Sequence, residues 1–336
     1  MTIFQYRFKL SFQNFVTISI IVFFILLKGV GYADSNKMKV VTTFTVIADI
    51  AKSELHPDLW QYCDVRNKEQ LRECCDGADV IINLAAEHRD DVTPKSLYDE
   101  VNIEGAKLLC EVASELEIKR IIFTSSAAIY GFPKTSLDES GEANYFNDYG
   151  RTKWLAEAEY RKWKDTDITN RLTIIRPTVI FGEGNRGNVY NLLRQIASGK
   201  FLMIGRGQNE KSMAYVGNIC AFIEYALAQD YEDETFNYVD KPDFNMRELV
   251  ARVTDILGRK LLLPFSVPAW IVYAGAAFFD LLAKVSGRKF PISMIRVKKF
   301  ESQTVFDATK MLQSGFVPPY SMPDALERTI RHEFID

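Results

Sequence analysis

Cysteine and histidine are scarce in this sequence, and neither is spaced as a metal site. The three histidines lie far apart in the 336 residues, and the five cysteines include an adjacent pair but no CxxC spacing. Such an arrangement does not suggest a zinc site or a disulfide framework. We therefore expect no metal, and thiols that are buried in a reducing compartment. The residues concerned are His56, His88, His332, Cys63, Cys74, Cys75, Cys110 and Cys220.

An excess of positive charge is also missing. The 41 Lys and Arg residues are balanced by 44 Asp and Glu residues, which gives a net charge of −3. Proteins that bind nucleic acid usually present a basic face, so no nucleic-acid partner is expected. With 47% hydrophobic and 25% charged residues, the chain has the composition of a globular α/β protein, either one large domain or a domain with a smaller lobe.

Residues 1–33 have the pattern of an export leader, which disagrees with a reducing compartment. Arg7 and Lys9 precede an apolar run of 13 residues, 15–27, and the small residues Gly31 and Ala33 follow it. A basic start, a short apolar run and small residues are typical of a signal peptide, here cleaved after Ala33. The run is shorter than the roughly 20 residues of a spanning helix, but an uncleaved membrane anchor stays open. The leader thus predicts the membrane or the periplasm.

Strand-like and helix-like segments alternate through residues 34–182. Continuous apolar runs at 78–86, 120–131 and 172–182 are separated by helical patterns at 98–116 and from about residue 148 to 163. This alternation predicts a Rossmann-like α/β fold, a parallel sheet with helices on both faces. Residues 183–336 differ in sequence pattern from residues 34–182. We expect them to form a smaller substrate-binding lobe over the carboxyl edge of that sheet. Within them, 261–287 is apolar but interrupted by prolines and charges, which favours a helix packed on the domain or resting at a membrane surface.

The stretch YGRTK, residues 149–153, carries the first chemical signal. Tyr149 and Lys153 are four residues apart, so one helix face presents a phenol and an ammonium group together. A nearby positive charge lowers the pKa of a phenol and makes it a usable base near neutral pH. The same spacing recurs in Tyr160 and Lys164, so spacing alone is weak evidence. Because TSSAAIYG places Ser126 at the end of a buried strand, 23 residues before Tyr149, we select the first pair and expect Tyr160 to be a surface residue.

With further motifs, the chain resembles the extended short-chain dehydrogenases/reductases, in particular the NAD-dependent epimerase/dehydratase family and its UDP-glucose 4-epimerases. The resemblance covers about residues 59–334. It rests on CDV (63–65), NLAAEH (83–88), VNIEGAKLL (101–109), TSSAAIYG (124–131), YGRTK (149–153), RPTVIFGEGNRGN (176–188) and FDATKMLQSGF (306–316). It implies a cytoplasmic enzyme body that uses NAD, acts on a nucleotide sugar and could form a homodimer.

The resemblance also implies the roles of individual residues. The catalytic set would be Ser126, Tyr149 and Lys153. Tyr149 would remove a proton from a sugar hydroxyl while hydride passes to NAD, Lys153 would hold the ribose and lower the tyrosine pKa, and Ser126 would orient the hydroxyl. Return of the hydride to the other face of the rotated keto-sugar would invert the carbon centre.

Further positions would contact the two ligands. The aspartate at 64 would meet the adenine, residues 84–86 would line the cofactor, residue 102 would support the active-site helix, and the backbone of 177–180 would face the nicotinamide. The implied cofactor set is Asp64, Val65, Leu84, Ala85, Ala86, Asn102, Tyr149, Lys153, Pro177 and Val179. The implied substrate set is Ser126, Arg176, Asn188 and Lys211, of which the last three could instead be surface charges or caps.

Two related activities can be weighed from the residues. Sugar 4,6-dehydratases carry an acidic pair directly after the serine or threonine, whereas this chain has Ala127 and Ala128 there, which argues against dehydration. Hydroxysteroid dehydrogenases share the Ser-Tyr-Lys set and stay open as an alternative. A non-catalytic, exported or membrane-tethered remnant of an epimerase is the alternative from another class.

The family's glycine-rich turn, which receives the pyrophosphate at a helix N-terminus, is missing or replaced. The only GxG before residue 182, at residues 29–31, lies beside the leader, and residues 38–52, MKVVTTFTVIADIAK, contain no glycine. This stretch is similar to the mature start of periplasmic zinc/manganese-binding proteins of ABC transporters. We therefore expect an export leader and one βα unit fused to an epimerase body, with cofactor binding impaired.

Overall fold

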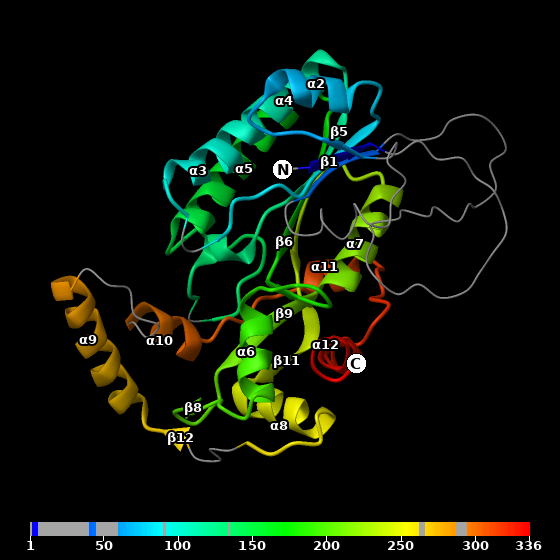
Figure 1. The fold of residues 1–336 in the computed structure, drawn as a ribbon. Coiled ribbons are helices and arrows are strands. Elements are labelled where there is room, and N and C mark those ends of the chain that lie inside the picture. The colour runs from blue at the N-terminus through cyan, green and yellow to red at the C-terminus, as the bar shows by residue number, and fades with distance from the viewer. Residues whose placement is uncertain are drawn as a thin grey trace.

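The computed structural model describes residues 2–5, 40–44, 60–89, 92–133, 135–261, 266–286 and 294–336. The apolar run 15–27 and residues 45–52 of the expected βα unit lie outside the described residues. The main sheet contains β1 (Thr2–Gln5), β2 (Val40–Phe44), β3 (Trp60–Tyr62), β4 (Val80–Asn83), β5 (Arg120–Thr124), β6 (Arg171–Pro177) and β10 (Asp233–Tyr238). Its strand order is β10-β6-β5-β4-β2-β1-β3 (Figure 1).

Five neighbouring strands of this sheet are parallel, which confirms the predicted fold class. From β2 through β4, β5 and β6 to β10, each pairing is parallel. The strands read as continuous apolar runs because helices cover both faces and leave no wet side. β1 is the exception, since it lies between β2 and β3 and runs antiparallel to both. Residues 2–5, which the leader prediction had assigned to an export signal, therefore form a strand of the sheet.

Two layers of helices bury the faces of the main sheet (Figure 1). On one face, side chains of α2, α4 and α5 pack against the sheet, and Leu71, Leu109 and Tyr160 belong to this core. On the other face, Phe222 and Met311, from α7 and α11, enclose a second core. The helices of the first layer are α2 (Lys68–Cys75), α3 (Ser96–Asp99), the π-helical turn η2 (Glu100–Glu104), α4 (Gly105–Glu115) and α5 (Asp148–Asp165), and those of the second are α7 (Val216–Ala228) and α11 (Thr309–Gln313).

A smaller lobe follows, with its own core around Phe181, Leu193 and Leu326. The boundary expected at 182/183 differs from the structure in both directions. β7, before the boundary, joins the lobe sheet, whereas β10, α7 and α11, after it, complete the main sheet and its cover. The lobe contains β7 (Val179–Phe181), α6 (Asn188–Ala197), β8 (Met203–Ile204), β9 (Glu210–Tyr215), β11 (Asp240–Asn245), α8 (Met246–Ile256), β12 (Ser266–Val267), α9 (Ala269–Ser286), α10 (Met294–Glu301) and α12 (Met322–Phe334).

The expectations for the cysteines and for a membrane-spanning helix can be compared with the described residues. Four cysteines are buried and Cys220 is half-buried, all as free thiols, as predicted. No helix in the described ranges combines the length and the hydropathy that a membrane span needs.

The close contact between α5 and the turn after β5 sets the position of the catalytic motif. This turn is a short 3₁₀ helix, η3 (Ala127–Tyr130). A Cβ atom on Gly150 would lie 2.5 Å from the carbonyl oxygen of Ala128 and 3.0 Å from Cβ of Tyr145. Real side chains do not approach a backbone oxygen so closely, so the contact exists because residue 150 is glycine. The glycine of YGRTK is therefore a packing requirement of the site.

We predict that Gly150→Ala lowers the free energy of unfolding by about 1–3 kcal/mol, because a methyl group must push α5 away from η3. Gly275→Ala is the matched control, because Gly275 also lies in a helix, α9, and a Cβ there meets nothing within 4 Å. This control should be neutral or stabilising by up to ~1 kcal/mol, the difference in helix propensity. Urea unfolding of the two variants measures the difference, and equal effects would contradict the packing account.

Candidate active site

The carboxyl ends of three adjacent parallel strands gather most of the predicted site. Leu84–Ala86 directly follow β4, Ser126 follows β5, and Pro177 ends β6. Because β4, β5 and β6 are parallel neighbours, these ends meet at one edge of the sheet. Ligand sites of open α/β sheets form at this edge. The described structure thus brings together segments that lie about 40 residues apart in the sequence.

Ser126 and Tyr149 face each other across this edge. Ser126 is the N-cap of η3, and its Oγ accepts a hydrogen bond from the backbone N–H of Ala128 over 3.1 Å. The Ser126 hydroxyl also lies near that of Tyr149, where it acts to lower the tyrosine pKa. Tyr149 is in the first turn of α5, where the Asn147 side chain caps the helix by accepting from the N–H of Gly150 over 2.9 Å. The serine and the tyrosine of the predicted catalytic set therefore lie beside each other.

Lys153 lies one turn further along α5 and is buried. Its exposure is 1%, and its Nζ lies 4.3 Å from the centroid of the Phe123 ring. Burial lowers the pKa of Lys153 to about 7, against the opposing effect of the Glu157 carboxylate. In the described part of the chain, the ammonium group has this aromatic face as its contact and no hydrogen-bond acceptor. A buried donor without an acceptor suits a ligand that supplies one.

The pKa of Tyr149 departs from the expectation. We expected Lys153 to lower it, but burial raises it, and only the Ser126 hydroxyl acts in the opposite direction. The physical reason is that desolvation penalises the phenolate directly, and Lys153 does not contribute to this shift.

The residues present fit a dinucleotide at this edge. Besides Lys153, the buried Oγ of Ser125 has no hydrogen-bond partner in the described structure, although its backbone N–H donates to Ile175 over 2.7 Å. Buried polar groups without a hydrogen-bond partner are rare in protein interiors, and they usually indicate that a water or a ligand binds there. The ribose of NAD carries hydroxyls that could satisfy both groups. Leu84 and Ala86 are half-buried and Ala85 is buried, so the segment after β4 presents apolar surface alongside.

Asn102 ties this segment to the catalytic helix. Its Nδ2 donates to the carbonyl of Glu87 over 3.0 Å and to Oγ1 of Thr152 over 2.8 Å, and its Oδ1 accepts from the N–H of Glu87 over 2.8 Å. Glu87 follows β4 and Thr152 lies on α5, so one buried side chain fixes the distance between the two walls of the site.

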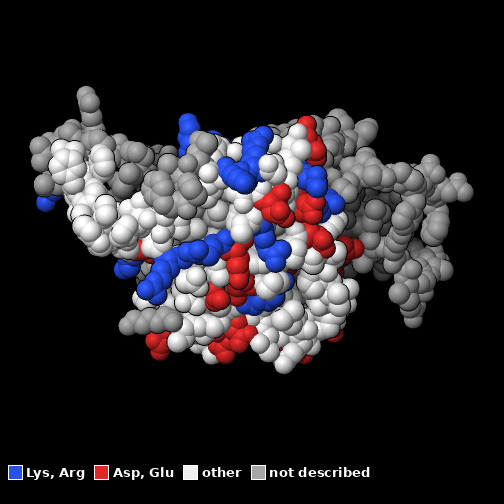
Figure 2. Space-filling view, turned by 90° about the horizontal axis from the view of Figure 1, so that it is seen from below, with Lys and Arg blue, Asp and Glu red and all other residues white. Residues whose placement is uncertain are grey.

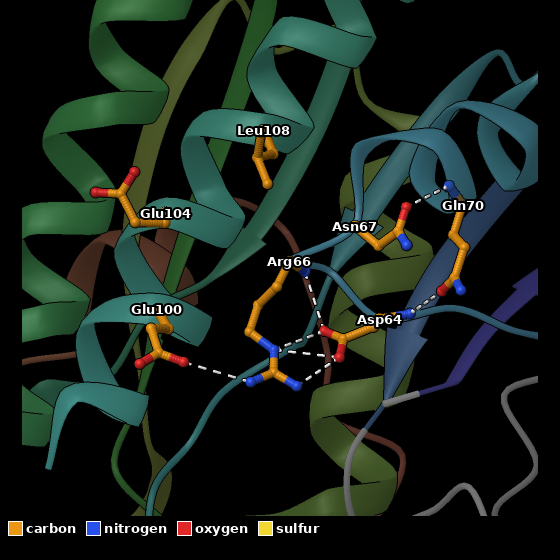
Figure 3. A pocket seen from close by; sticks show the side chains of 7 residues that line it. All are labelled: Asp64, Arg66, Asn67, Gln70, Glu100, Glu104 and Leu108. Carbon is orange, nitrogen blue, oxygen red and sulfur yellow. Dashed lines mark hydrogen bonds and ion pairs between the residues drawn. The ribbon is translucent and has the colours of Figure 1, made fainter. Parts of the chain in front are cut away.

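Asp64 lines a separate shallow pocket of about 480 Å³ beside the end of β3 (Figure 3). Arg66 holds its carboxylate in an ion pair of 2.6 Å, which keeps the pKa of Asp64 below its usual value. Val65, the next residue, is buried, and a Cβ on Gly105 would lie 2.9 Å from its Cγ2. The remaining lining residues are Asn67, Gln70, Glu100, Glu104 and Leu108.

The predicted substrate residues are not equivalent. Arg176 is 3% exposed, and its guanidinium binds Glu157 through two hydrogen bonds of 2.9 and 2.7 Å and the Tyr130 hydroxyl over 2.6 Å. This arginine is thus a buried structural cation, which corrects the prediction that it contacts substrate. Asn188 is exposed at the start of α6. Lys211, on β9, donates to the carbonyl of Ser302, and burial lowers its pKa to about 8.

The expectation that Tyr160 is a surface residue is wrong. Its side chain is fully buried, its ring centroid lies 4.4 Å from that of Phe123, and its hydroxyl accepts a hydrogen bond from Asn83. The spacing of Tyr160 and Lys164 could not reveal this burial, because spacing alone does not show that Tyr160 lies on the core-facing side of α5. The sequence analysis did not identify Glu157, the buried partner of Arg176. Its position four residues after Lys153, on the same helix face, was the signal that could have identified it.

At the nicotinamide end, Pro177 is buried and Val179 is 37% exposed on β7. No cluster of three or more metal-ligating side chains occurs in the residues that the structure describes. The arrangement offers a hydroxyl pair, a buried amine and an apolar wall, which is chemistry for moving a proton beside a bound redox cofactor.

We predict that Lys153→Met stabilises the fold at neutral pH. Since the folded state lowers the lysine pKa from 10.5 to about 7, the unfolded chain binds this proton more tightly between those values. Stability should therefore rise as pH increases from about 7 toward 10.5, and removing the charge should raise the free energy of unfolding at pH 7 by about 1–4 kcal/mol. Urea unfolding near pH 7 and pH 9 measures this, with Lys164→Met on the same helix as control. A Lys153→Met protein that is less stable than wild type near pH 7 would contradict it.

Comparison with known proteins agrees with this geometry. A 4-epimerase of N-acetyl-alpha-D-glucosaminyl-diphospho-ditrans,octacis-undecaprenol, from Escherichia coli O157:H7, is 50% identical over 291 residues, covering 85% of this chain and 87% of the relative. Among solved structures, a double mutant of dTDP-glucose 4,6-dehydratase from Streptomyces venezuelae, with NAD bound, is similar with a TM-score of 0.68 at 21% identity, covering 87% and 86% of the two chains. UDP-glucuronic acid 4-epimerase from Bacillus cereus, in complex with NAD, gives 0.66 at 18% identity and covers 85% and 84%.

The match at the level of the family includes the sheet edge described above. The profile of the NAD dependent epimerase/dehydratase family matches residues 34–238, more than half of the chain, from before β2 to the end of β10. Together with the relative that is 50% identical, this match shows that the chain belongs to the NAD dependent epimerase/dehydratase family.

Proposed function

We propose that this chain is a 4-epimerase of a sugar that is linked through a diphosphate to a carrier. The observation that carries the proposal is the placement of Ser126 at the N-cap of η3 beside Tyr149 on α5, with buried Lys153 one turn away, at the carboxyl edge of the sheet. The relative from Escherichia coli O157:H7 supports a more specific substrate, N-acetylglucosamine on a polyprenyl diphosphate, in place of a nucleotide sugar. Ala127 and Ala128 stand where a dehydratase needs acidic residues, so elimination of water is not part of the proposal.

The side chains of the site would act on one hydroxyl of the sugar. NAD, when bound, supplies the acceptor for the hydride from the sugar carbon and its donor on return. Tyr149 takes the hydroxyl proton, Ser126 holds the hydroxyl toward the phenolate, and the resulting keto-sugar keeps its carbon skeleton. Protonation by Tyr149 after the sugar has turned restores the alcohol with the opposite configuration.

Lys153 and Ser125 are the residues that would hold the ribose of NAD in this mechanism. An acceptor beside the buried ammonium stabilises its charged form and raises its pKa. A fully charged Lys153 then lowers the pKa of Tyr149, which burial alone holds high. The base would thus be activated by cofactor binding itself. Asn188 and Lys211 are the described polar residues of the lobe that we assign to substrate.

We further propose that NAD binds more weakly here than in relatives that have the glycine-rich turn. β2 pairs with β4 as the first strand of the dinucleotide fold would, but residues 32–76 contain no glycine. A side chain on Cβ keeps a backbone N–H away from a phosphate. Losing two charge-assisted hydrogen bonds, each worth about 1.5–3 kcal/mol, weakens binding by about 10²- to 10⁴-fold.

The N-terminal features belong to the same proposal. Residues 1–33 would be an anchor, which keeps β1 in the sheet, or an export leader, whose cleavage would remove β1. They would be joined with a transporter-like βα unit to the NAD-binding part, residues 34–182 completed by α7, β10 and α11, and to the substrate lobe, the rest of 183–336 with β7. Export or anchoring would place the chain in the membrane or periplasm, where NAD is scarce, and a homodimer is the assembly that we propose. A non-catalytic remnant is the outcome if activity is absent.

We predict that Tyr149→Phe abolishes 4-epimerisation, with a loss of at least about 10²-fold, because the base is removed without a change of shape. The assay incubates detergent-solubilised N-acetylglucosaminyl diphosphoryl undecaprenol with protein and saturating NAD, and chromatography of the released sugar identifies the product. Tyr160→Phe is the control on the same helix. It removes the hydrogen bond that Asn83 donates to the Tyr160 hydroxyl, so we expect stability to fall by about 1–2 kcal/mol while the folded enzyme keeps its activity.

Two results would contradict the proposal. One is an equal loss of turnover in Tyr149→Phe and Tyr160→Phe after correction for the folded fraction. The other is a wild-type protein that binds NAD but leaves the sugar unchanged.

A further inference from the structure

The segment from β12 to the end of α10 stands at the edge of the lobe and presents an unusual surface. We call residues 266–286 and 294–301, that is β12, α9 and α10, the arm. Figure 1 shows α9 apart from the sheet, with α10 between it and the rest of the protein. β12 pairs with β8, and the side chain of Asn209 donates to the carbonyl of Phe300 over 2.7 Å, so the lobe fixes the arm at both ends.

The polarity of α9 is inverted relative to a helix that packs on a soluble domain. Its outward stripe is apolar, and the large side chains Trp270 and Phe278 are 72% and 59% exposed. Two of its polar side chains are turned toward α10, since Asp280 accepts a hydrogen bond from the N–H of Met294 over 3.0 Å and Tyr273 lies near Glu301, which acts to raise the tyrosine pKa. The exposed residues recur at helical spacing and form one stripe: Trp270, Ile271, Ala274, Ala277 and Phe278.

Exposed apolar stripes of this kind mark contact surfaces rather than random exposure. Elsewhere on the described protein, large exposed apolar side chains are scattered, as Leu155 on α5, Ile168 in a loop and Leu312 on α11 are, and they do not form a stripe along a helix. In Figure 2 the described surface at the left, on the side where α9 lies in Figure 1, is mostly white, while charged side chains gather over the centre.

The charge of this segment indicates what the stripe contacts. Residues 266–301 contain six Lys and Arg residues and two acidic residues, a net charge of +4 in a chain whose net charge is −3. The basic residues are Lys284, Arg288, Lys289, Arg296, Lys298 and Lys299. An apolar helix face that carries Trp, together with a cluster of basic residues, matches an anionic lipid surface, with the tryptophan at the boundary between headgroups and acyl chains.

We propose that the arm is a membrane-binding surface that lies in the interface of an anionic phospholipid bilayer. Trp270, Ile271 and Phe278 enter the boundary between headgroups and acyl chains, and the exposed Lys284 and Lys298 contact lipid phosphates. A second copy of this chain is a poorer partner for the stripe, because its arm carries the same net positive charge and the two arms would repel each other.

The arm also adjoins the catalytic end of the protein. Lys298 lies 5.9 Å from the ring centroid of Phe132, which follows the η3 turn that carries Ser126. The segment after α10 contacts Lys211, through the carbonyl of Ser302 and the bridge to Thr304. A bilayer beneath the arm therefore lies beside the site, and a sugar diphosphate whose lipid stays in the membrane could reach it; this last step rests on the proposed function.

The test measures binding of the full chain to vesicles of phosphatidylglycerol and phosphatidylethanolamine by flotation, and the depth of Trp270 by quenching with brominated lipids. Trp270→Phe serves as the blank, so the difference from wild type reports this tryptophan alone, whatever residues 15–27 do. We expect Trp270 to be quenched, and the double variant Trp270→Glu/Phe278→Glu to bind at least about tenfold more weakly. Ile168→Glu, at a residue that is 94% exposed and far from the arm, should bind as wild type does. High salt or phosphatidylcholine vesicles should also weaken binding.

Several results would overturn the proposal. Protein that floats without quenching of Trp270 would show that another segment holds it to the membrane. A wild-type dimer in sedimentation velocity that the double variant dissociates, with no quenching, would assign the stripe to a second copy. Neither measurement needs substrate or NAD, so such a failure would leave the proposed 4-epimerase activity intact, and loss of that activity would leave the membrane surface intact.

Discussion

The contact of α5 with the carbonyl of Ala128 is the constraint on which the site depends. Only a residue without a side chain lets the helix lie against η3 at this distance, and Gly150 is that residue. The same turn holds Ser126 at its N-cap, so the position of the helix and the position of the serine are set together. Tyr149 precedes the glycine and is thereby brought beside Ser126, whose hydroxyl acts to lower the tyrosine pKa. The relative position of Ser126 and Tyr149 thus follows from backbone packing.

Two buried cations near the candidate site, Arg176 and Lys153, differ in their hydrogen-bond partners. Arg176 has a full set of acceptors, with a bidentate carboxylate from Glu157 and a phenol from Tyr130, and it is a structural element. Lys153 has an aromatic ring and no acceptor among the described residues, and its pKa falls to about 7. A buried amine without an acceptor destabilises the folded protein, so the position of Lys153 makes sense only if a ligand completes it. The contrast separates a cation kept for stability from one kept for binding.

The sequence predicted the parallel sheet and the edge at which the site lies, because continuous apolar strands and their connecting helices are local patterns. Through the family motifs it singled out Ser126, Tyr149 and Lys153 as the catalytic set, which stays a prediction. It could not tell that Arg176 would be buried against Glu157, since that pair joins a strand to a helix 19 residues away. Nor could it place Tyr160, because only the packing of α5 shows which side of the helix faces Phe123. The antiparallel β1 in the sheet was equally hidden, since residues 2–5 precede a leader-like run and pair over long distances.

The central claim is that an NAD-dependent epimerase site has kept its catalytic residues while its phosphate-binding turn is replaced. Calorimetric titration with NAD, run side by side on this chain and on the relative from Escherichia coli O157:H7, tests it most directly. The account predicts that this chain binds NAD, that Lys153→Met weakens the binding further, and that the wild-type affinity is about 10²- to 10⁴-fold below that of the relative. Micromolar or tighter affinity, within tenfold of the relative, would show that the segment after β2 has rebuilt the phosphate site, and would contradict the account.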